Sequence, residues 1–232
     1  MGSLAEQIAH NVDDVKERIA NAAARSGRRA DDVTLVAVTK YVDAATTRHL
    51  VAAGCTNLGE SRPQALWQKA ESLADLPQIQ WHQIGHMQRN KLARTLPLIS
   101  LLHSVDSDRL VATIEELSQK LSVVTPILLE VDISGEQSKH GFTPNDVDRT
   151  LETISTCSNI SLRGLMGMAS RAGGIDRARK DFIALRELRD SLLPKCPSNV
   201  SLDEISMGMS GDFEVAIEEG ATIVRVGSAL FP

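Results

Sequence analysis

The stretch Val33-Thr34-Leu35-Val36-Ala37-Val38-Thr39-Lys40 decides how this chain of 232 residues folds. Its first six residues form an apolar, β-branched run, which is long enough for one buried strand and too short for a helix. Upstream, residues 4–25 carry apolar side chains three or four positions apart, as an amphipathic helix requires. The sequence therefore opens with a helix, continues into a buried strand, and ends that strand on a lysine.

The alternation of strands and helices continues to the end of the chain. Further strand-like runs cover residues 57–59, 79–84, 101–104, 126–133, 161–165, 202–205 and 223–226. Helical patterns lie between them at 43–53, 61–74, 87–96, 107–121, 144–156, 175–192 and 211–219. Strands that alternate with helices in this way favour parallel pairing through right-handed crossovers.

Eight such units in a chain of this length predict an α/β fold, a (β/α)8 TIM-type barrel with an extra N-terminal helix outside the repeat. An open, doubly wound sheet is the alternative architecture. Low-complexity and linker segments are absent from the sequence. We therefore expect residues 1–232 to form a single domain, with residues 1–27 packed outside the barrel.

The composition is that of an ordinary globular protein, with 42% hydrophobic residues, 24% charged residues and a formal net charge of −5. Interspersed charges of this size argue against nucleic-acid binding. No signal peptide and no apolar run of about 18 residues is recognised, so we expect no membrane association. Cys55, Cys157 and Cys196 are too widely spaced for a redox pair, which fits reduced thiols in the cytoplasm.

Lys40 stands where a barrel places its functional groups, at the carboxyl end of a strand. An amine that rises from an apolar barrel floor is expected to be poorly solvated and partly uncharged, and it can then attack an aldehyde to form a Schiff base. The alternative for Lys40 taken alone is an ordinary solvated loop lysine.

The last strand adds a phosphate site to this reading. Gly227 and Ser228 directly follow it, and phosphate sites of such barrels commonly lie after strands seven and eight. Their backbone N–H groups are suited to phosphate oxygens, and Ser206 offers a hydroxyl from the neighbouring strand end. Ser210 and Asp212 are instead expected to cap the following helix. A phosphorylated aldehyde fits this arrangement, and so does the sugar phosphate of a Schiff-base aldolase.

Several segments together resemble one known family, from about Val33 to Phe231. They are 36–40 (VAVTK), 59–60 (GE), 81–91 (WHQIGHMQRNK), 162–166 (LRGLM), 206–210 (SMGMS) and 221–231 (ATIVRVGSALF). With all of these segments in this order, the chain resembles the pyridoxal phosphate homeostasis protein family, also called the YggS/PROSC family. Residue 61 departs from the family pattern, because Ser61 stands where relatives usually have Asn.

The resemblance implies a fold-type III barrel for pyridoxal 5'-phosphate (PLP), similar to the N-terminal domain of alanine racemase. It implies that Lys40 carries PLP as a Schiff base and that Arg225 faces the pyridine nitrogen. By the same resemblance, the phosphate would be held by Ser206, Gly227 and Ser228, and the neighbouring wall would be lined by Met207 and Gly208. No cofactor contact is assigned to Ser61.

The histidine-containing segments suggest support of the site rather than metal binding. His82 lies late in the third strand and is expected to point into the top of the barrel, hydrogen-bonded behind the residues that touch the cofactor. Neither His82 nor His86 has further ligands at a suitable spacing, so no metal site is expected. Lys139, His140 and Gly141 are expected to form a loop on the rim.

The function that follows is that of a PLP-binding protein in intracellular vitamin B6 homeostasis, without substrate turnover and with PLP-dependent apo-enzymes as possible recipients. A cation at Arg225 disfavours a protonated ring nitrogen and so weakens the ring as an electron sink. The only tyrosine, Tyr41, is next to Lys40, and no second domain is expected to supply another base. A PLP-dependent amino-acid racemase, or another fold-type III enzyme, is the first alternative, and the Schiff-base aldolase is the second.

Overall fold

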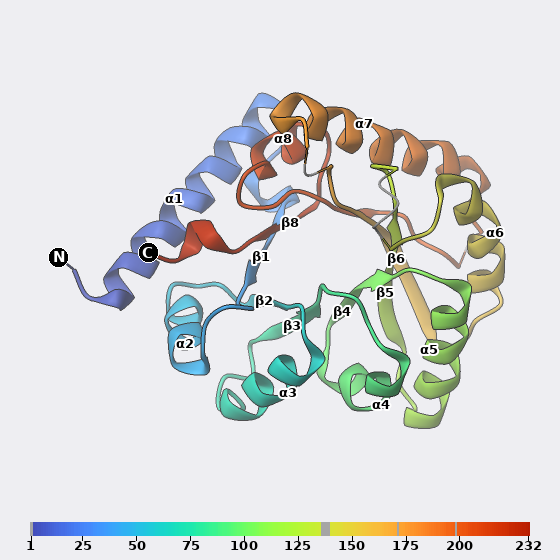
Figure 1. The fold of residues 1–232 in the computed structure, drawn as a ribbon, viewed down its shortest axis with the longest axis horizontal. Helices are drawn as coiled ribbons and strands as arrows, with labels where there is room; N and C mark the ends of the chain where they lie inside the picture. Colours follow the sequence, from blue (N-terminus) through green and yellow to red (C-terminus); the bar gives the residue numbers. More distant parts are fainter. Residues whose placement is uncertain (1, 136–139, 171, 198) are drawn as a thin grey trace.

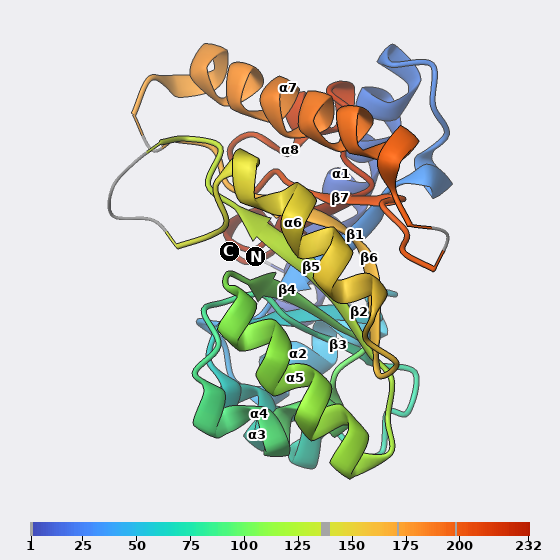
Figure 2. The same ribbon diagram turned by 90° about the vertical axis from the view of Figure 1, so that its right-hand side faces the viewer.

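Eight parallel strands close into a barrel in chain order, and helices surround it (Figures 1 and 2). The structure is a computed structural model that describes residues 2–135, 140–170, 172–197 and 199–232. Closure is made by β1, which pairs with β2 on one side and with β8 on the other. The (β/α)8 prediction is confirmed, and the open doubly wound sheet is wrong because the sheet has no free edge at β1.

The elements follow the alternation that the sequence predicts. The strands are β1 (Thr34–Val38), β2 (Asn57–Glu60), β3 (Gln80–Gln83), β4 (Leu101–Val105), β5 (Thr125–Val131), β6 (Ile160–Gly167), β7 (Glu204–Ser206) and β8 (Ile223–Val226). The helices are α1 (Leu4–Arg25), α2 (Ala44–Ala52), α3 (Pro63–Ser72), α4 (Leu92–Thr95), α5 (Asp108–Leu121), α6 (Pro144–Ser155), α7 (Gly174–Leu192) and α8 (Phe213–Glu218).

Two apolar layers stabilise the barrel. Inside it, one residue each from five strands packs into a small cluster, made of Val36, Leu101, Leu128, Met166 and Ile223. A larger cluster lies between the strands and the surrounding helices and extends from α1 to the end of the chain. Both clusters exist because successive side chains of a strand point to opposite faces, and both faces of this sheet are covered.

Helix α1 lies outside the repeat, against α2 and α8 (Figure 1). Ser3 and Glu6 form a capping box at its start, and its apolar face is buried from Ile8 to Ala23. It also forms two ion pairs to α8, through Arg18 with Glu214 and through Arg25 with Glu218. This packing places α1 outside the barrel repeat. That residues 1–232 form a single domain stays a prediction.

Local boundaries differ from the predicted ones where a specific residue intervenes. The helix expected over 87–96 is broken into a 3-10 turn at Arg89–Lys91, the short α4, and a second 3-10 turn at Leu96–Leu98, where Pro97 prevents continuation of the α-helix. Strand β5 ends earlier than expected because the Asp132 carboxylate accepts hydrogen bonds from the N–H groups of Ser134 and Gly135 and turns the chain.

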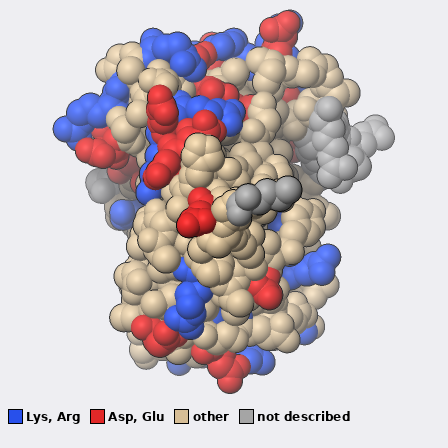
Figure 3. All heavy atoms as spheres, turned by 90° about the vertical axis from the view of Figure 1, so that its left-hand side faces the viewer, with Lys and Arg blue, Asp and Glu red and all other residues tan. Residues whose placement is uncertain are grey.

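Charged side chains of both signs are mixed on the face shown in Figure 3. On the face in Figure 3, Lys and Arg side chains lie among Asp and Glu side chains, and no large area of one charge stands out. Within the ranges given above, no helix has both the length and the apolar character to cross a bilayer. Of the expected rim loop, Lys139 lies outside the described residues.

Candidate functional site

A cavity of about 930 Å³ opens at the carboxyl ends of the barrel strands. Its wall is built from the segments that follow β1, β2, β3, β6, β7 and β8 and from strand residues such as Glu130 of β5, together with His140 after β5. Four of the residues proposed from the sequence lie on this wall, namely Lys40, Arg225, Gly227 and Ser228. The volume is in the range of small-molecule and cofactor sites.

Lys40 projects at the mouth of this cavity and not from a buried floor. The residue is exposed, and its ammonium lies 4.9 Å from the centre of the Tyr41 ring, which is itself 85% exposed. The predicted desolvation of Lys40 is therefore not observed. The reason is local, because β1 ends at Val38 and the Thr39 side chain points toward the helix layer, where it is hydrogen-bonded to Glu60, and Lys40 follows in the loop above the barrel.

A buried ion pair holds the backbone directly before Lys40. Lys69 of α3 is paired with the carboxylate of Glu60 and donates a hydrogen bond of 2.6 Å to the carbonyl oxygen of Thr39. The Thr39 hydroxyl donates to the same carboxylate at 2.7 Å. All three residues are buried, so the end of β1 is tied to the end of β2 by charged groups shielded from water. This network is not visible in the sequence, because nothing in the pattern of α3 distinguishes Lys69 from a surface lysine.

Arg225 is buried in the barrel wall beneath the cavity. Its Nη1 donates to the carbonyl oxygen and to the hydroxyl of Ser206, at 2.9 and 2.5 Å, and its Nη2 donates to the carbonyl oxygen of Gly167. Burial lowers the pKa of the guanidinium to about 10, while Glu130 and Asp212 act in the opposite direction. Arg225 is thus a cation held in a fixed orientation on the cavity wall.

A chain of hydrogen bonds leads from Arg225 across the interior of the barrel. Ser206 Oγ lies 2.9 Å from His103 Nδ1, His103 Nε2 lies 2.9 Å from His82 Nδ1, and His82 Nε2 lies 3.1 Å from Asn57 Oδ1. The Asn57 side-chain oxygen can only accept, so His82 donates at Nε2; with both histidines neutral, each accepts at Nδ1 and donates at Nε2, and the Ser206 hydroxyl donates to His103 while it accepts from Arg225. The tautomers of both histidines follow from this single direction.

Burial keeps these two histidines neutral. It lowers the pKa of His82 to about 4, and it lowers the pKa of His103 well below the ordinary value, with added repulsion from His82 and Arg225. His82 therefore lies behind Arg225, linked to it through two hydrogen-bonded residues, and it is not on the cavity wall. The sequence did not reveal His103, the central member of this chain.

The residues predicted to hold the phosphate do not all lie on the cavity wall. Gly227 and Ser228 lie on the cavity wall, but Ser206 is fully buried and its hydroxyl is engaged by Arg225 and His103. The last residue of β7 faces the barrel interior, so in this structure the Ser206 side chain does not reach the cavity. Ser210 lies on the wall in its place, and its hydroxyl accepts a hydrogen bond from the N–H group of Gly227.

The capping role expected of Ser210 and Asp212 is also wrong. Asp212 stands at the position before α8, but its side chain caps no helical N–H group and instead accepts from the N–H group of Met209 at 2.6 Å. Ser210 is occupied by Gly227. The two side chains therefore shape the loop after β7, which lies against the loop after β8.

Met207 and Gly208 are not among the residues that line the cavity, contrary to the wall position expected for them. Met207 points to the opposite face from Ser206 and is fully buried in the outer core. Gly208 has a φ of +90°, and a Cβ atom there would lie 2.5 Å from the Cβ of Ala216. A tight turn against α8 explains this glycine.

Glu130 is a carboxyl group on the cavity wall that sequence reasoning missed. It is 5% exposed, and burial raises its pKa to about 7, with further increases from Asp106 and Asp132 and an opposing effect of Arg225. A carboxyl group of this kind exchanges a proton near neutral pH. Alternation along β5 identifies its apolar positions, but it does not show which polar residue faces the barrel opening.

Ser61 and Gly85 form the part of the wall that follows β2 and β3. The Ser61 carbonyl oxygen accepts a hydrogen bond from the side chain of Gln83, and so does the Gly85 carbonyl oxygen. A Cβ atom at residue 85 would lie 2.4 Å from the Ser61 carbonyl oxygen, so the two loops meet at backbone distance only because residue 85 is glycine.

Comparison with known proteins gives a consistent result. Residues 5–232 match the family described as "Alanine racemase, N-terminal domain". A protein of Aquifex aeolicus named pyridoxal phosphate homeostasis protein is 39% identical over 217 residues, which cover 94% of each chain. A crystal structure of an unknown protein from Bifidobacterium adolescentis superposes with a TM-score of 0.92 at 38% identity, over 98% of this chain and 95% of that one.

One solved structure was determined with a cofactor. PipY of Synechococcus elongatus, whose structure is described as having PLP bound, superposes with a TM-score of 0.83 at 32% identity, and the match covers 94% of this chain and 100% of PipY. The relatives are therefore matched along nearly their whole length, barrel and first helix included.

Proposed function

The chain belongs to the family of pyridoxal phosphate homeostasis proteins, and we propose that it binds PLP covalently through Lys40 and serves as a PLP carrier in vitamin B6 homeostasis. The observation that carries the proposal is the sharing of one cavity by an amine at Lys40, a guanidinium at Arg225 and the Gly227-Ser228 loop. PLP needs these three kinds of group, for its aldehyde, its ring nitrogen and its phosphate.

The residues present fit this cofactor. The wall carries hydroxyls at Ser210 and Ser228 for phosphate oxygens, and apolar side chains at Val38, Ile84 and Met209 for the faces of a ring. Gly227 has no side chain, so a phosphate group can approach its backbone closely. A Cβ atom at this position would contact the side chain of Val38 at 3.4 Å. When bound, PLP supplies an aldehyde that condenses with the lysine amine, releasing one water molecule, and an electron-withdrawing ring.

The carrier function is supported by what surrounds Lys40. Its ammonium rests on the exposed ring of Tyr41, at the open end of the cavity, where a bound molecule is reachable from solvent. Arg225 presents a cation to the ring side of the site, and this disfavours a protonated pyridine nitrogen. The proposed recipients are apo-enzymes that depend on PLP.

The absorption spectrum of the purified protein tests the cofactor. We expect a visible band that borohydride removes and that Lys40→Ala lacks, with the reduced cofactor found on the Lys40 peptide by mass spectrometry. Lys195→Ala, which removes an exposed lysine near Asp148, is the matched control and should retain the band. A colourless parent protein that also fails to take up added PLP would contradict the proposal and would return the aldolase to consideration.

A racemase or a related PLP enzyme is the second candidate, and Glu130 is the observation that favours it. A carboxyl group with a pKa of about 7 on the cavity wall can hold or release a proton beside a bound substrate. Incubation of the PLP-loaded protein with each enantiomer of common amino acids separates the two functions. Turnover above that of free PLP, lost in Glu130→Gln, would replace the carrier function by catalysis.

A further inference from the structure

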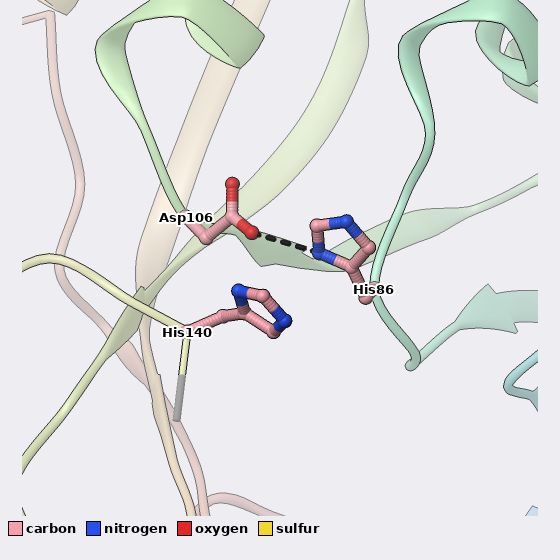
Figure 4. Close-up of side chains that lie close together, drawn as sticks. All are labelled: His86, Asp106 and His140. Atoms are coloured by element: carbon pink, nitrogen blue, oxygen red, sulfur yellow. Dashed lines mark hydrogen bonds and ion pairs between the residues drawn. The ribbon is translucent and has the colours of Figure 1, made fainter. Parts of the chain in front are cut away.

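Three side chains with metal-binding atoms meet beside the mouth of the cavity. His86 follows β3, Asp106 follows β4 and His140 follows β5, and one ligand atom from each lies within 4.8 Å of the other two (Figure 4). His86 Nδ1 is 2.9 Å from Asp106 Oδ2, and the imidazole rings of His86 and His140 are stacked with their centres 4.4 Å apart.

Hydrogen bonds hold the described backbone near each of the three residues. Before His86, the carbonyl oxygen of Gly85 accepts hydrogen bonds from the side chains of Gln83 and Ser104, at 3.1 and 2.6 Å. These contacts fix the turn from which the His86 side chain projects.

The other two positions are held in similar ways. The Asp106 side chain is 10% exposed, and its second oxygen accepts a hydrogen bond from Ser107. His140 precedes Phe142, whose backbone is hydrogen-bonded to Glu130 and Asp132 at 2.8 and 3.0 Å. A carboxylate whose free oxygen is already bound by a neighbour is oriented in the way that metal sites require.

We propose that His86, Asp106 and His140 form a binding site for a divalent transition-metal ion, best matched by Zn²⁺. Two imidazole nitrogens and one carboxylate oxygen are typical zinc ligands, and three protein ligands are the usual number where a fourth position stays open. Atoms that share a tetrahedral zinc ion lie about 3.3 Å apart, so the observed separations require only small rotations of side chains, two of which are exposed.

The open position has a defined surrounding. His86 and His140 both line the cavity that contains Lys40 and Arg225, whereas Asp106 lies behind them. A metal ion bound here would place its fourth position at the cavity mouth, where a water molecule or a carboxylate or phosphate oxygen of a small molecule could occupy it. The proposal does not depend on PLP, because the ligands are separate from Lys40 and from the Gly227-Ser228 loop.

The spacing of these three residues in the sequence does not indicate a metal site, and for this reason none was expected. The three residues are 20 and 34 positions apart and belong to no short ligand motif. The alternative is that His86 and Asp106 form an ion pair and His140 merely stacks on it. The two alternatives differ in the role of His140, because the pair of His86 and Asp106 does not require it, whereas the metal site does.

Zinc binding to the chelator-treated, PLP-free protein tests the proposal. Titration with ZnCl2 against a chromophoric chelator should show one bound ion per chain. His86→Ala, Asp106→Asn and His140→Ala should each weaken binding by at least about tenfold, because each removes or neutralises one of three ligands. Circular dichroism of the metal-free variants should match that of the parent, since the cluster lies at the surface of the mouth.

Two matched controls separate this site from adventitious binding. His10→Ala removes an exposed histidine of α1, and Cys157→Ser removes a partly exposed thiol; both should bind zinc like the parent. Absence of stoichiometric binding would overturn the proposal. So would unchanged affinity in His140→Ala, which would leave only the ion pair, or a loss in the control variants equal to that in the ligand variants.

Discussion

The guanidinium of Arg225 donates a 2.5 Å hydrogen bond to the hydroxyl of Ser206, and this bond joins the arginine to a chain of hydrogen bonds across the barrel interior. Because the Asn57 side-chain oxygen at the end of the chain can only accept, His82 donates to Asn57, the neutral His103 donates to His82, and Ser206 donates to His103. The cation on the cavity wall is thus connected to the far side of the barrel by neutral groups in one fixed arrangement.

Removal of the Ser206 hydroxyl should destabilise the protein. Ser206→Ala leaves His103 Nδ1 without its donor and Arg225 without one acceptor, both in a fully buried place. We expect a loss of about 1–3 kcal/mol in the free energy of unfolding of the PLP-free protein, measured in urea. Ser72→Ala, at an exposed serine of α3, should stay within about 0.5 kcal/mol of the parent. Equal stability of the two variants would mean that the chain of hydrogen bonds contributes nothing.

The buried histidine His82 should make the stability depend on pH. Its pKa is about 4 in the folded protein and about 6.5 when unfolded, so between these values the unfolded chain takes up a proton that the folded protein does not. The contribution of His82 is therefore complete above pH 6.5 and falls by about 3 kcal/mol as the pH approaches 4. Glu130 acts in the opposite sense between pH 7 and 4.5, because burial raises its pKa to about 7.

Comparison of variants removes the effect of Glu130 from this measurement. The difference in unfolding free energy between the parent and His82→Asn should shrink steadily as the pH is lowered from 7 to 4.5, since only the parent loses the His82 contribution. The difference between the parent and Ser72→Ala, which removes an exposed hydroxyl and no titratable group, should stay constant. A parent-to-His82→Asn difference that does not change with pH would show that His82 is not held neutral.

The fold was predictable because it rests on repeated local patterns. Strands such as Thr34–Val38 are short apolar runs buried on both faces, and the helices between them carry one apolar face each. Errors occurred where one residue overrides the pattern, as Pro97 does when it ends α4 and as Asp132 does when it ends β5. Neither effect alters the order of the strands.

The site was less predictable, because contacts across the barrel leave no periodic signal. The expected wall residues Lys40, Arg225, Gly227 and Ser228 share one cavity. Their neighbours Glu130 and His103, and the buried Lys69, come from other strands and helices and look ordinary in sequence. Alternation also explains the position of Met207, since the residue after an inward-facing Ser206 faces the outer core.

The Glu60–Lys69 pair should be strongly coupled to the stability of the barrel end that carries Lys40. Lys69→Met leaves the Glu60 carboxylate buried without a cation, and we expect it to cost about 3–5 kcal/mol in urea unfolding. The double variant Glu60→Gln/Lys69→Met should recover part of that loss, because no buried charge is left alone. Lys120→Met, which breaks the exposed pair with Glu116, should leave the stability close to that of the parent. If the double variant is no more stable than Lys69→Met, the loss of stability comes from the packing of the Lys69 side chain and not from its charge.

Two glycines on the cavity wall should respond differently to the same added methyl group. In Gly85→Ala the new Cβ would come within 2.4 Å of the Ser61 carbonyl oxygen, which is backbone and must move, whereas nothing lies within 4 Å of a Cβ added at Gly211. We expect Gly85→Ala to lower the free energy of unfolding by about 1–3 kcal/mol and Gly211→Ala to leave it nearly unchanged.

The same pair of variants relates this wall to PLP. Displacement of the Ser61 loop changes the shape of the cavity beside Lys40, so Gly85→Ala should also weaken PLP uptake, followed by the visible band during titration of the PLP-free protein. Gly211→Ala should take up PLP with parental affinity if its methyl group points away from the cofactor. Parental stability and parental uptake in Gly85→Ala would show that the two loops tolerate separation and that their close contact does not shape the site.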